Sequence, residues 1–139
     1  MDIVEANADP VPPRYTTRAA IDRLNLRLQL SPDKYCQDWE IELADSLRVE
    51  EFVDIYETES LDDDERFALM ALIVASFEDV LSENPEKQDC WPRISQALHS
   101  QFDLHSYTVS YWAAPGADLK DGCFSITPLM REVWAACQT

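Results

Sequence analysis

The pattern of hydrophobic and polar positions predicts a mainly helical chain. The run from Phe67 to Ala75 is apolar without interruption, and a helix that is apolar on every side is normally surrounded by other elements. Asp62 with Glu65 three residues later fits the capping box that begins many helices. We therefore expect a central helix over about residues 62–82.

Shorter amphipathic segments predict the helices around this centre. Residues 49–57 place their hydrophobic side chains on one stripe and acidic side chains on the other faces, a spacing typical of a surface helix. Residues 89–101 and the segment that follows Thr127-Pro128 show the same spacing. Each of the three segments is expected to cover part of the central helix.

The first third of the chain is harder to interpret. Ser31-Pro32 fits an N-cap serine followed by proline in the first helical position, which predicts a helix with Tyr35, Trp39 and Leu43 facing inward. Residues 16–30 fit both a helical face and an alternating strand. We favour a helix there that ends in extended chain.

A change of period near the C-terminus predicts a β-hairpin. Tyr107, Val109 and Tyr111 alternate with polar neighbours, and the only two glycines lie in the turn that follows. The fold class is therefore predicted as mainly α. We expect a bundle of about five helices around the central helix (about 62–82), with a small hairpin (about 105–112 and 123–126).

Length and proline content predict one domain with an arm. A chain of 139 residues is typical of a single domain. Pro10, Pro12 and Pro13 disfavour regular structure at the start of the chain. We expect residues 1–15 to form a flexible N-terminal arm and residues 16–139 to form a single globular domain.

The formal net charge of −16 changes the picture most. Such a surface disfavours direct binding to nucleic acid, which depends on Lys and Arg, and to anionic membranes, while it attracts a basic protein. Residues 37–65 hold thirteen acidic side chains against Arg48 alone, a net charge of −12, whereas residues 14–28 hold four arginines against Asp22. The stretch is either an interface or only a solvated acidic face.

Nine carboxylates of this stretch are the candidates for partner binding. A basic toxin or effector is the partner that such charge favours, and whether the chain also forms a homo-oligomer is left open. The candidate residues are Asp38, Glu42, Glu50, Glu51, Asp54, Glu57, Glu59, Asp62 and Asp63.

Catalytic and cofactor motifs are scarce. Two glycines in one turn exclude the glycine-rich loops that cradle phosphates. His99 and His105 have no neighbouring residues at metal-ligand spacing. A pair of carboxylates and a Cys123–His105 pair are the catalytic arrangements left to consider. We expect no catalytic residues, no cofactor, no metal site and a protein that is not an enzyme.

The cysteines and the start of the chain indicate the cytosol. Four widely spaced cysteines without an export signal are expected to be buried free thiols. No apolar run approaches the roughly 18 residues that a membrane-spanning helix needs. A cytoplasmic location is therefore predicted.

Parts of the sequence resemble small bacterial proteins of the immunity type. The resembling segments are Gln37-Asp38-Trp39-Glu40, Asp64 to Met70, Tyr111-Trp112 and Ile126 to Arg131. The resemblance implies a cytosolic protein that neutralises a toxin by binding it. The alternative is a regulatory or nucleic-acid-mimicking acidic protein that blocks a DNA-binding or defence complex.

Overall fold

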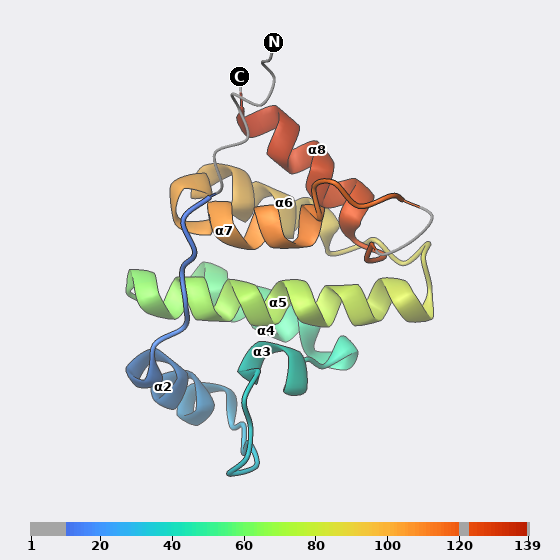
Figure 1. The fold of residues 1–139 in the computed structure, drawn as a ribbon. Coiled ribbons are helices and arrows are strands. Elements are labelled where there is room, and N and C mark those ends of the chain that lie inside the picture. The colour runs from blue at the N-terminus through green and yellow to red at the C-terminus, as the bar shows by residue number, and fades with distance from the viewer. Residues whose placement is uncertain (1–10, 120–122, 139) are drawn as a thin grey trace.

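The computed structural model describes residues 11–119 and 123–138, and within them the chain is mainly helical. Figure 1 shows α5 (Asp63–Glu83) in the middle, with α6 (Trp91–Ser100), α7 (Phe102–Ala113) and α8 (Thr127–Cys137) on one side. On the other side lie α2 (Arg18–Leu28), α3 (Trp39–Glu42), the 3-10 turn η1 (Ser46–Arg48) and α4 (Val49–Thr58).

The expected central helix is present as α5. Fourteen of its 21 residues are buried, because elements pack against it from both sides. The capping box is formed: Asp62 accepts from the Glu65 backbone N–H at 2.8 Å, and the Glu65 carboxylate accepts from the Asp62 N–H at 3.0 Å. The buried side chains of all the helices meet in one hydrophobic cluster around α5.

The predicted β-hairpin is wrong. Residues 102–113 form α7, and no strand occurs in the described part of the chain, from which residues 120–122 of the predicted turn are missing. The side chains that α7 buries are His105, Thr108, Val109, Trp112 and Ala113. Their spacing is helical, but two of them are polar. The hydrophobic residues alone alternate every second position, so they predicted a strand instead of a helix.

Two further expectations on the helices need correction. The segment after Ser31-Pro32 is a loop, and helix begins only at Trp39, where α3 lasts a single turn. The described residues form seven α-helices instead of about five, and α7 is the one that stands in place of the predicted hairpin. The arm over residues 1–15 stays a prediction, since residues 1–10 lie outside the described part.

Polar contacts fix the last helix against the rest. Glu78 of α5 accepts from the backbone N–H groups of Ser125 and Ile126, at 3.0 and 2.8 Å. Arg131 of α8 donates to the carbonyls of Ala113, Ala114 and Ala117, which satisfies the C-terminal end of α7. No helix in the described residues is long and apolar enough to span a membrane.

Candidate functional site

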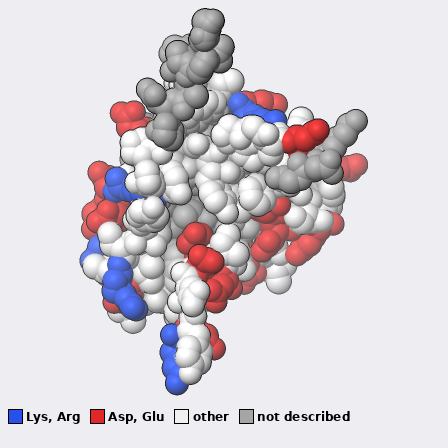
Figure 2. Space-filling model, viewed as in Figure 1, with Lys and Arg blue, Asp and Glu red and all other residues white. Residues whose placement is uncertain are grey.

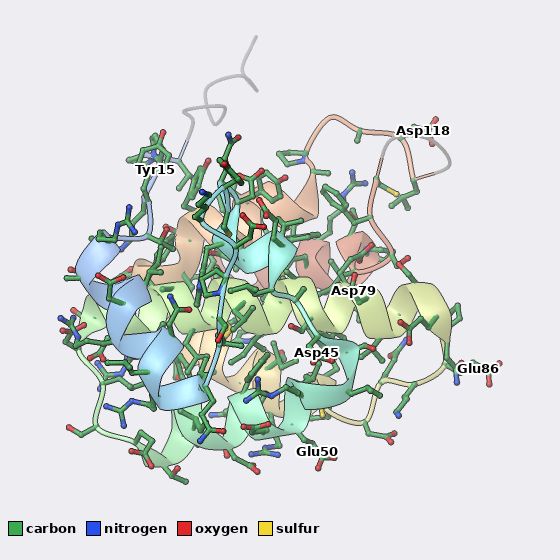
Figure 3. All side chains as sticks on the ribbon, turned by 90° about the horizontal axis from the view of Figure 1, so that it is seen from below. Tyr15, Asp45, Glu50, Asp79, Glu86 and Asp118 are labelled. Carbon is green, nitrogen blue, oxygen red and sulfur yellow. The ribbon has the colours of Figure 1, made fainter. Side chains whose placement is uncertain are left out.

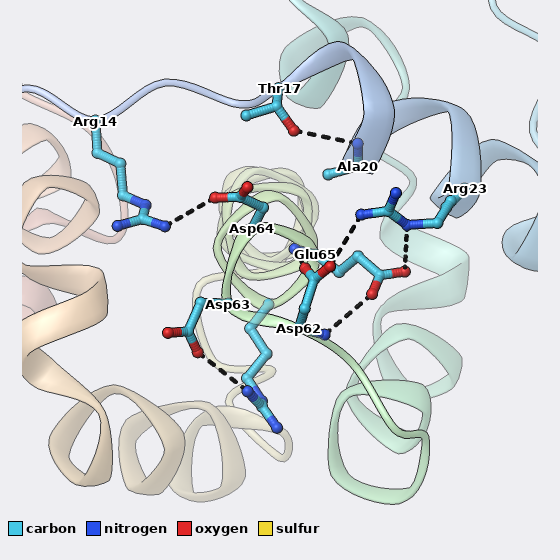
Figure 4. Close-up of polar contacts among 9 residues, drawn as sticks. Arg14, Thr17, Ala20, Arg23, Asp62, Asp63, Asp64 and Glu65 are labelled. Carbon is cyan, nitrogen blue, oxygen red and sulfur yellow. Dashed lines mark hydrogen bonds and ion pairs between the residues drawn. The ribbon is translucent and has the colours of Figure 1, made fainter.

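Arginines of α2 neutralise the carboxylates at the start of α5. Arg23 contacts Asp62 at 3.0 Å and Glu65 at 3.3 Å, and Arg27 contacts Glu59 at 2.7 Å. Figure 4 shows how Arg23 lies against the capping box. The basic segment 14–28 therefore folds back onto part of the acidic stretch.

A second set of arginines neutralises α4. Arg93 of α6 bridges Asp54 at 2.6 Å and Glu57 at 2.7 Å. Arg48 contacts Glu51 at 2.7 Å, which lowers the pKa of the Glu51 carboxyl. These arginines occupy carboxylates that were expected to face a partner.

Six of the nine predicted partner-binding residues are thus paired with an arginine, the last being Asp63 with Arg66 at 3.2 Å. Exposed ion pairs of this kind stabilise a fold by only about 0–1 kcal/mol each. Their main effect is on charge, because each arginine offsets one negative charge of the acidic stretch.

The three remaining predicted residues have different surroundings. Glu42 accepts from the backbone N–H groups of Gln37 and Asp38, both at 3.0 Å, which lower the pKa of its carboxyl and hold the loop before α3. Asp38 and Glu50 are exposed and take part in no ion pair among the described residues. Of the nine predicted residues, Asp38, Glu42 and Glu50 are therefore the three without an arginine partner in the described part of the chain.

The structure adds an acidic surface of which the sequence reasoning had named only Glu50 as a candidate for partner binding. Asp45, Glu50, Asp79 and Glu83 surround η1 and the C-terminal half of α5, without an ion pair among the residues described; we name them the η1–α5 acidic surface. Figure 3 labels three of the four. Burial, and after it the carboxylates of Glu83 and Asp45, raise the pKa of Asp79.

Figure 2 shows the resulting asymmetry on one face. Near α2 the basic side chains are interleaved with acidic ones, while acidic side chains near the right edge have few basic neighbours. The sequence did hold a signal for this surface: residues 76–90 contain five acidic residues and one lysine. Fewer charges lie there than in residues 37–65, so the weaker signal was overlooked.

Leu47 of η1 gives this surface an apolar element. Its side chain is 92% exposed and borders a pocket of about 270 Å³ that Phe77, Val80 and Cys90 also line. Lys87 lines the same pocket. Burial raises the pKa of the Cys90 thiol, so the thiol stays protonated at neutral pH and is a poor nucleophile.

A second, larger pocket of about 360 Å³ lies between α3, α5, α7 and residues 14–16. Aromatic rings and two carboxylates line much of it. We name it the aromatic–acidic pocket, and the residues that define it are Tyr15, Asp38, Glu40, Tyr107, Tyr111 and Trp112.

The tyrosines of this pocket were expected in a strand or an arm. Tyr107 and Tyr111 are four residues apart on α7 and so share a helical face. Tyr15 packs edge-on against Tyr107 with ring centroids 6.4 Å apart. A helical reading of residues 102–113 would have grouped them, because both lie off the buried stripe.

The considered Cys123–His105 pair is not formed. His105 is fully buried, and its Nε2 lies 2.8 Å from the Tyr56 hydroxyl. The Cys123 thiol instead donates to the Leu119 carbonyl at 3.2 Å. Burial, assisted by Arg14 and Arg66, lowers the pKa of His105 to about 4.

No group of three or more His, Cys, Asp or Glu side chains in the described residues is placed to hold a metal ion. The four cysteines are free thiols, each half-buried. Comparisons with protein-family models, curated proteins and solved structures find no match to this chain. Its function therefore has to be inferred from its own residues and geometry.

Proposed function

We propose that the chain is a non-enzymatic binding protein that recognises a basic protein through the η1–α5 acidic surface. The observation that carries the proposal is the position of Asp45, Asp79 and Glu83 around η1 and the end of α5. Their carboxylates lack a basic partner among the described residues, while arginines contact most carboxylates of the neighbouring stretch. Like charges held together destabilise a fold. A basic partner would relieve this repulsion by forming ion pairs with the carboxylates.

The surface also has what an interface needs besides charge. Carboxylates steer a basic partner and raise its association rate, but affinity needs apolar area that is desolvated on contact. Leu47 and the pocket beside it supply such area, within reach of Glu50. Charge and apolar contact can therefore act on the same partner.

Among proteins that bind basic partners, we favour an immunity-type inhibitor that acts in the cytoplasm on a toxin. The support is the sequence resemblance of residues 37–134 to such proteins, together with the scarcity of catalytic motifs. Inhibition would come from covering a functional surface of the toxin, which requires no chemistry from this chain.

Affinity capture from native lysate, at low and high salt, tests the proposal. The bait is the full chain, beside a variant with Glu50→Gln, Asp79→Asn and Glu83→Gln. We expect the wild type to retain a basic protein whose production arrests growth, and co-production of this chain to relieve the arrest. The variant should associate with the purified partner about tenfold more slowly at low salt.

A matched control separates this surface from net charge. Glu51→Gln, Glu59→Gln and Asp63→Asn remove the same amount of charge, but from carboxylates that arginines already neutralise. The control should bind nearly as the wild type does. Equal loss in both variants would reduce the effect to bulk charge, and capture of only acidic proteins or nucleic acid would refute the proposal.

A further inference from the structure

The aromatic–acidic pocket combines the two groups that hold a guanidinium. Tyr107 and Tyr111 present rings along one face of α7, and Asp38 and Glu40 bring carboxylates from α3 and its N-cap. Aromatic faces attract cations through their quadrupole, and carboxylates accept charge-assisted hydrogen bonds from them. Neither carboxylate takes part in an ion pair among the described residues.

The exposure of the pocket side chains is unusual for their type. Tyr15 is 73%, Tyr111 52% and Ile41 48% exposed around the opening. The pocket volume of about 360 Å³ lies near the lower end of the range for ligand sites, roughly 300–1,000 Å³. It is suited to one side chain or a small ligand.

The chain already binds its own guanidinium groups in this way. Arg14 lies over the Phe67 ring at 5.3 Å and contacts Asp64 at 3.0 Å. This pairing, visible in Figure 4, neutralises the one arginine that lines the pocket. Arg48 is held similarly, 4.9 Å from the Phe52 ring centroid and paired with Glu51.

We propose that the aromatic–acidic pocket binds an arginine side chain presented by a basic protein partner. The guanidinium would lie against the tyrosine rings while its N–H groups donate to Asp38 and Glu40. Arginine suits this lining better than lysine because its planar group stacks on rings and donates along two directions at once. The inference rests on the proposed function for its partner, since it assigns that partner's anchoring side chain.

Small probes test the pocket without the partner. The isotope-labelled full chain is titrated with N-acetyl-arginine amide and, separately, with N-acetyl-citrulline amide, which has nearly the same shape and no charge. We expect the arginine probe to shift the amide signals of residues 38–41 and 107–112 in a saturable manner. The citrulline probe should bind much more weakly.

Two conservative variants keep the test independent of folding. Asp38→Asn and Glu40→Gln should each weaken the arginine probe about threefold, the size of one exposed cation contact. Asp38 makes no side-chain capping bond, so its replacement leaves α3 intact. Asp79→Asn with Glu83→Gln, on the other acidic surface, should leave probe binding unchanged.

Three outcomes overturn the inference. They are equal binding of the two probes, shifts that centre on the η1–α5 acidic surface, and equal weakening by the Asp79→Asn, Glu83→Gln control. The capture experiment can fail while the probe experiment succeeds. If the probe binds but no basic partner is captured, the cation site is supported and only the proposed function is overturned. Capture of a basic partner without probe binding overturns the pocket and leaves the proposed function standing.

Discussion

At the scale of single residues, the most constrained polar group is His105. It lies in the core of α7, touches the Tyr56 hydroxyl through Nε2, and its Nδ1 has no hydrogen-bond partner among the described residues. Tyr56 also donates to Gln101. Burial in such surroundings favours the neutral imidazole. The free energy of unfolding therefore depends on the pH at which His105 is protonated.

The low pKa of His105 predicts acid sensitivity. Its pKa of about 4 in the folded state lies below the ordinary value of 6.5, so the unfolded chain binds the extra proton first. The free energy of unfolding should therefore be highest above pH 6.5. It should fall as the pH drops towards 4, by up to about 3 kcal/mol. Urea denaturation at pH 7.0, 5.5 and 4.5 measures this loss.

The second histidine provides the control for this prediction. His105→Gln should lower stability at pH 7 but flatten the dependence on pH between 6.5 and 4. His99 is exposed, and His99→Gln should keep the wild-type profile. An unchanged profile in His105→Gln would assign the acid sensitivity to other groups.

At the scale of elements, the junction of α7 and α8 shows how side chains distant in sequence provide hydrogen-bond donors for the carbonyls at the end of a helix. α7 ends at Ala114 in a left-handed conformation with φ of 47°, which is strained for a residue other than glycine. Arg131 donates to carbonyls there, and the Thr127 hydroxyl donates to the Trp112 carbonyl at 2.8 Å. Side chains of α8 thus replace a local glycine cap.

Removal of this cap should loosen both helices. Arg131→Met keeps most of the apolar stem but leaves partly buried carbonyls without donors, so we expect the chain to lose about 1–3 kcal/mol of stability. Thermal and urea unfolding measure the loss. Arg18→Met removes an exposed arginine that takes part in no ion pair among the residues described and should change stability little; similar losses in both variants would contradict a capping role.

At the scale of the whole molecule, charge is divided into a neutralised part and an uncompensated part. Arginines from distant segments meet the carboxylates of residues 51–65, while the η1–α5 acidic surface keeps its charge. A surface that is kept uncompensated sacrifices stability, which is common at binding sites. Stability and partner binding should then change in opposite directions.

Neutralisation of Asp79 tests this opposition. Asp79 and Glu83 are four residues apart on α5, a spacing at which like charges destabilise a helix by about 0.2–0.5 kcal/mol. Asp79→Asn should stabilise the chain by that amount at pH 7. Because the folded-state pKa of Asp79 is raised, the ionised form costs stability as the pH rises, and the gain should vanish below the ordinary value of 3.8.

The paired carboxylate of Asp63 serves as the comparison in the same measurements. Asp63→Asn removes the contact with Arg66 and a charge near the positive end of α5, so it should be neutral or slightly destabilising. Stabilisation of similar size in both variants would show that bulk charge, and not the crowding at η1 and α5, sets the effect.

The sequence alone predicted the mainly helical class, the central helix and the capping box at its start. These features depend on local spacing: an apolar run of nine residues and an aspartate three positions before a glutamate are visible without any partner segment. It also determined that carboxylates dominate the surface, and it identified Asp38 and Glu50 among the candidates.

Two features could not be predicted before the chain was seen folded: which charges remain uncompensated, and that residues 102–113 form a helix. Arg23, Arg27 and Arg93 meet carboxylates more than 30 residues away along the chain, and no local pattern specifies such pairing. α7 buries His105 and Thr108, two polar residues whose burial depends on Tyr56 and on the packing of neighbouring helices. A search for hydrophobic residues alone therefore did not find the helical stripe of α7. Both results follow from one physical cause: burial and charge pairing are properties of the assembled fold, which segments distant in sequence create together.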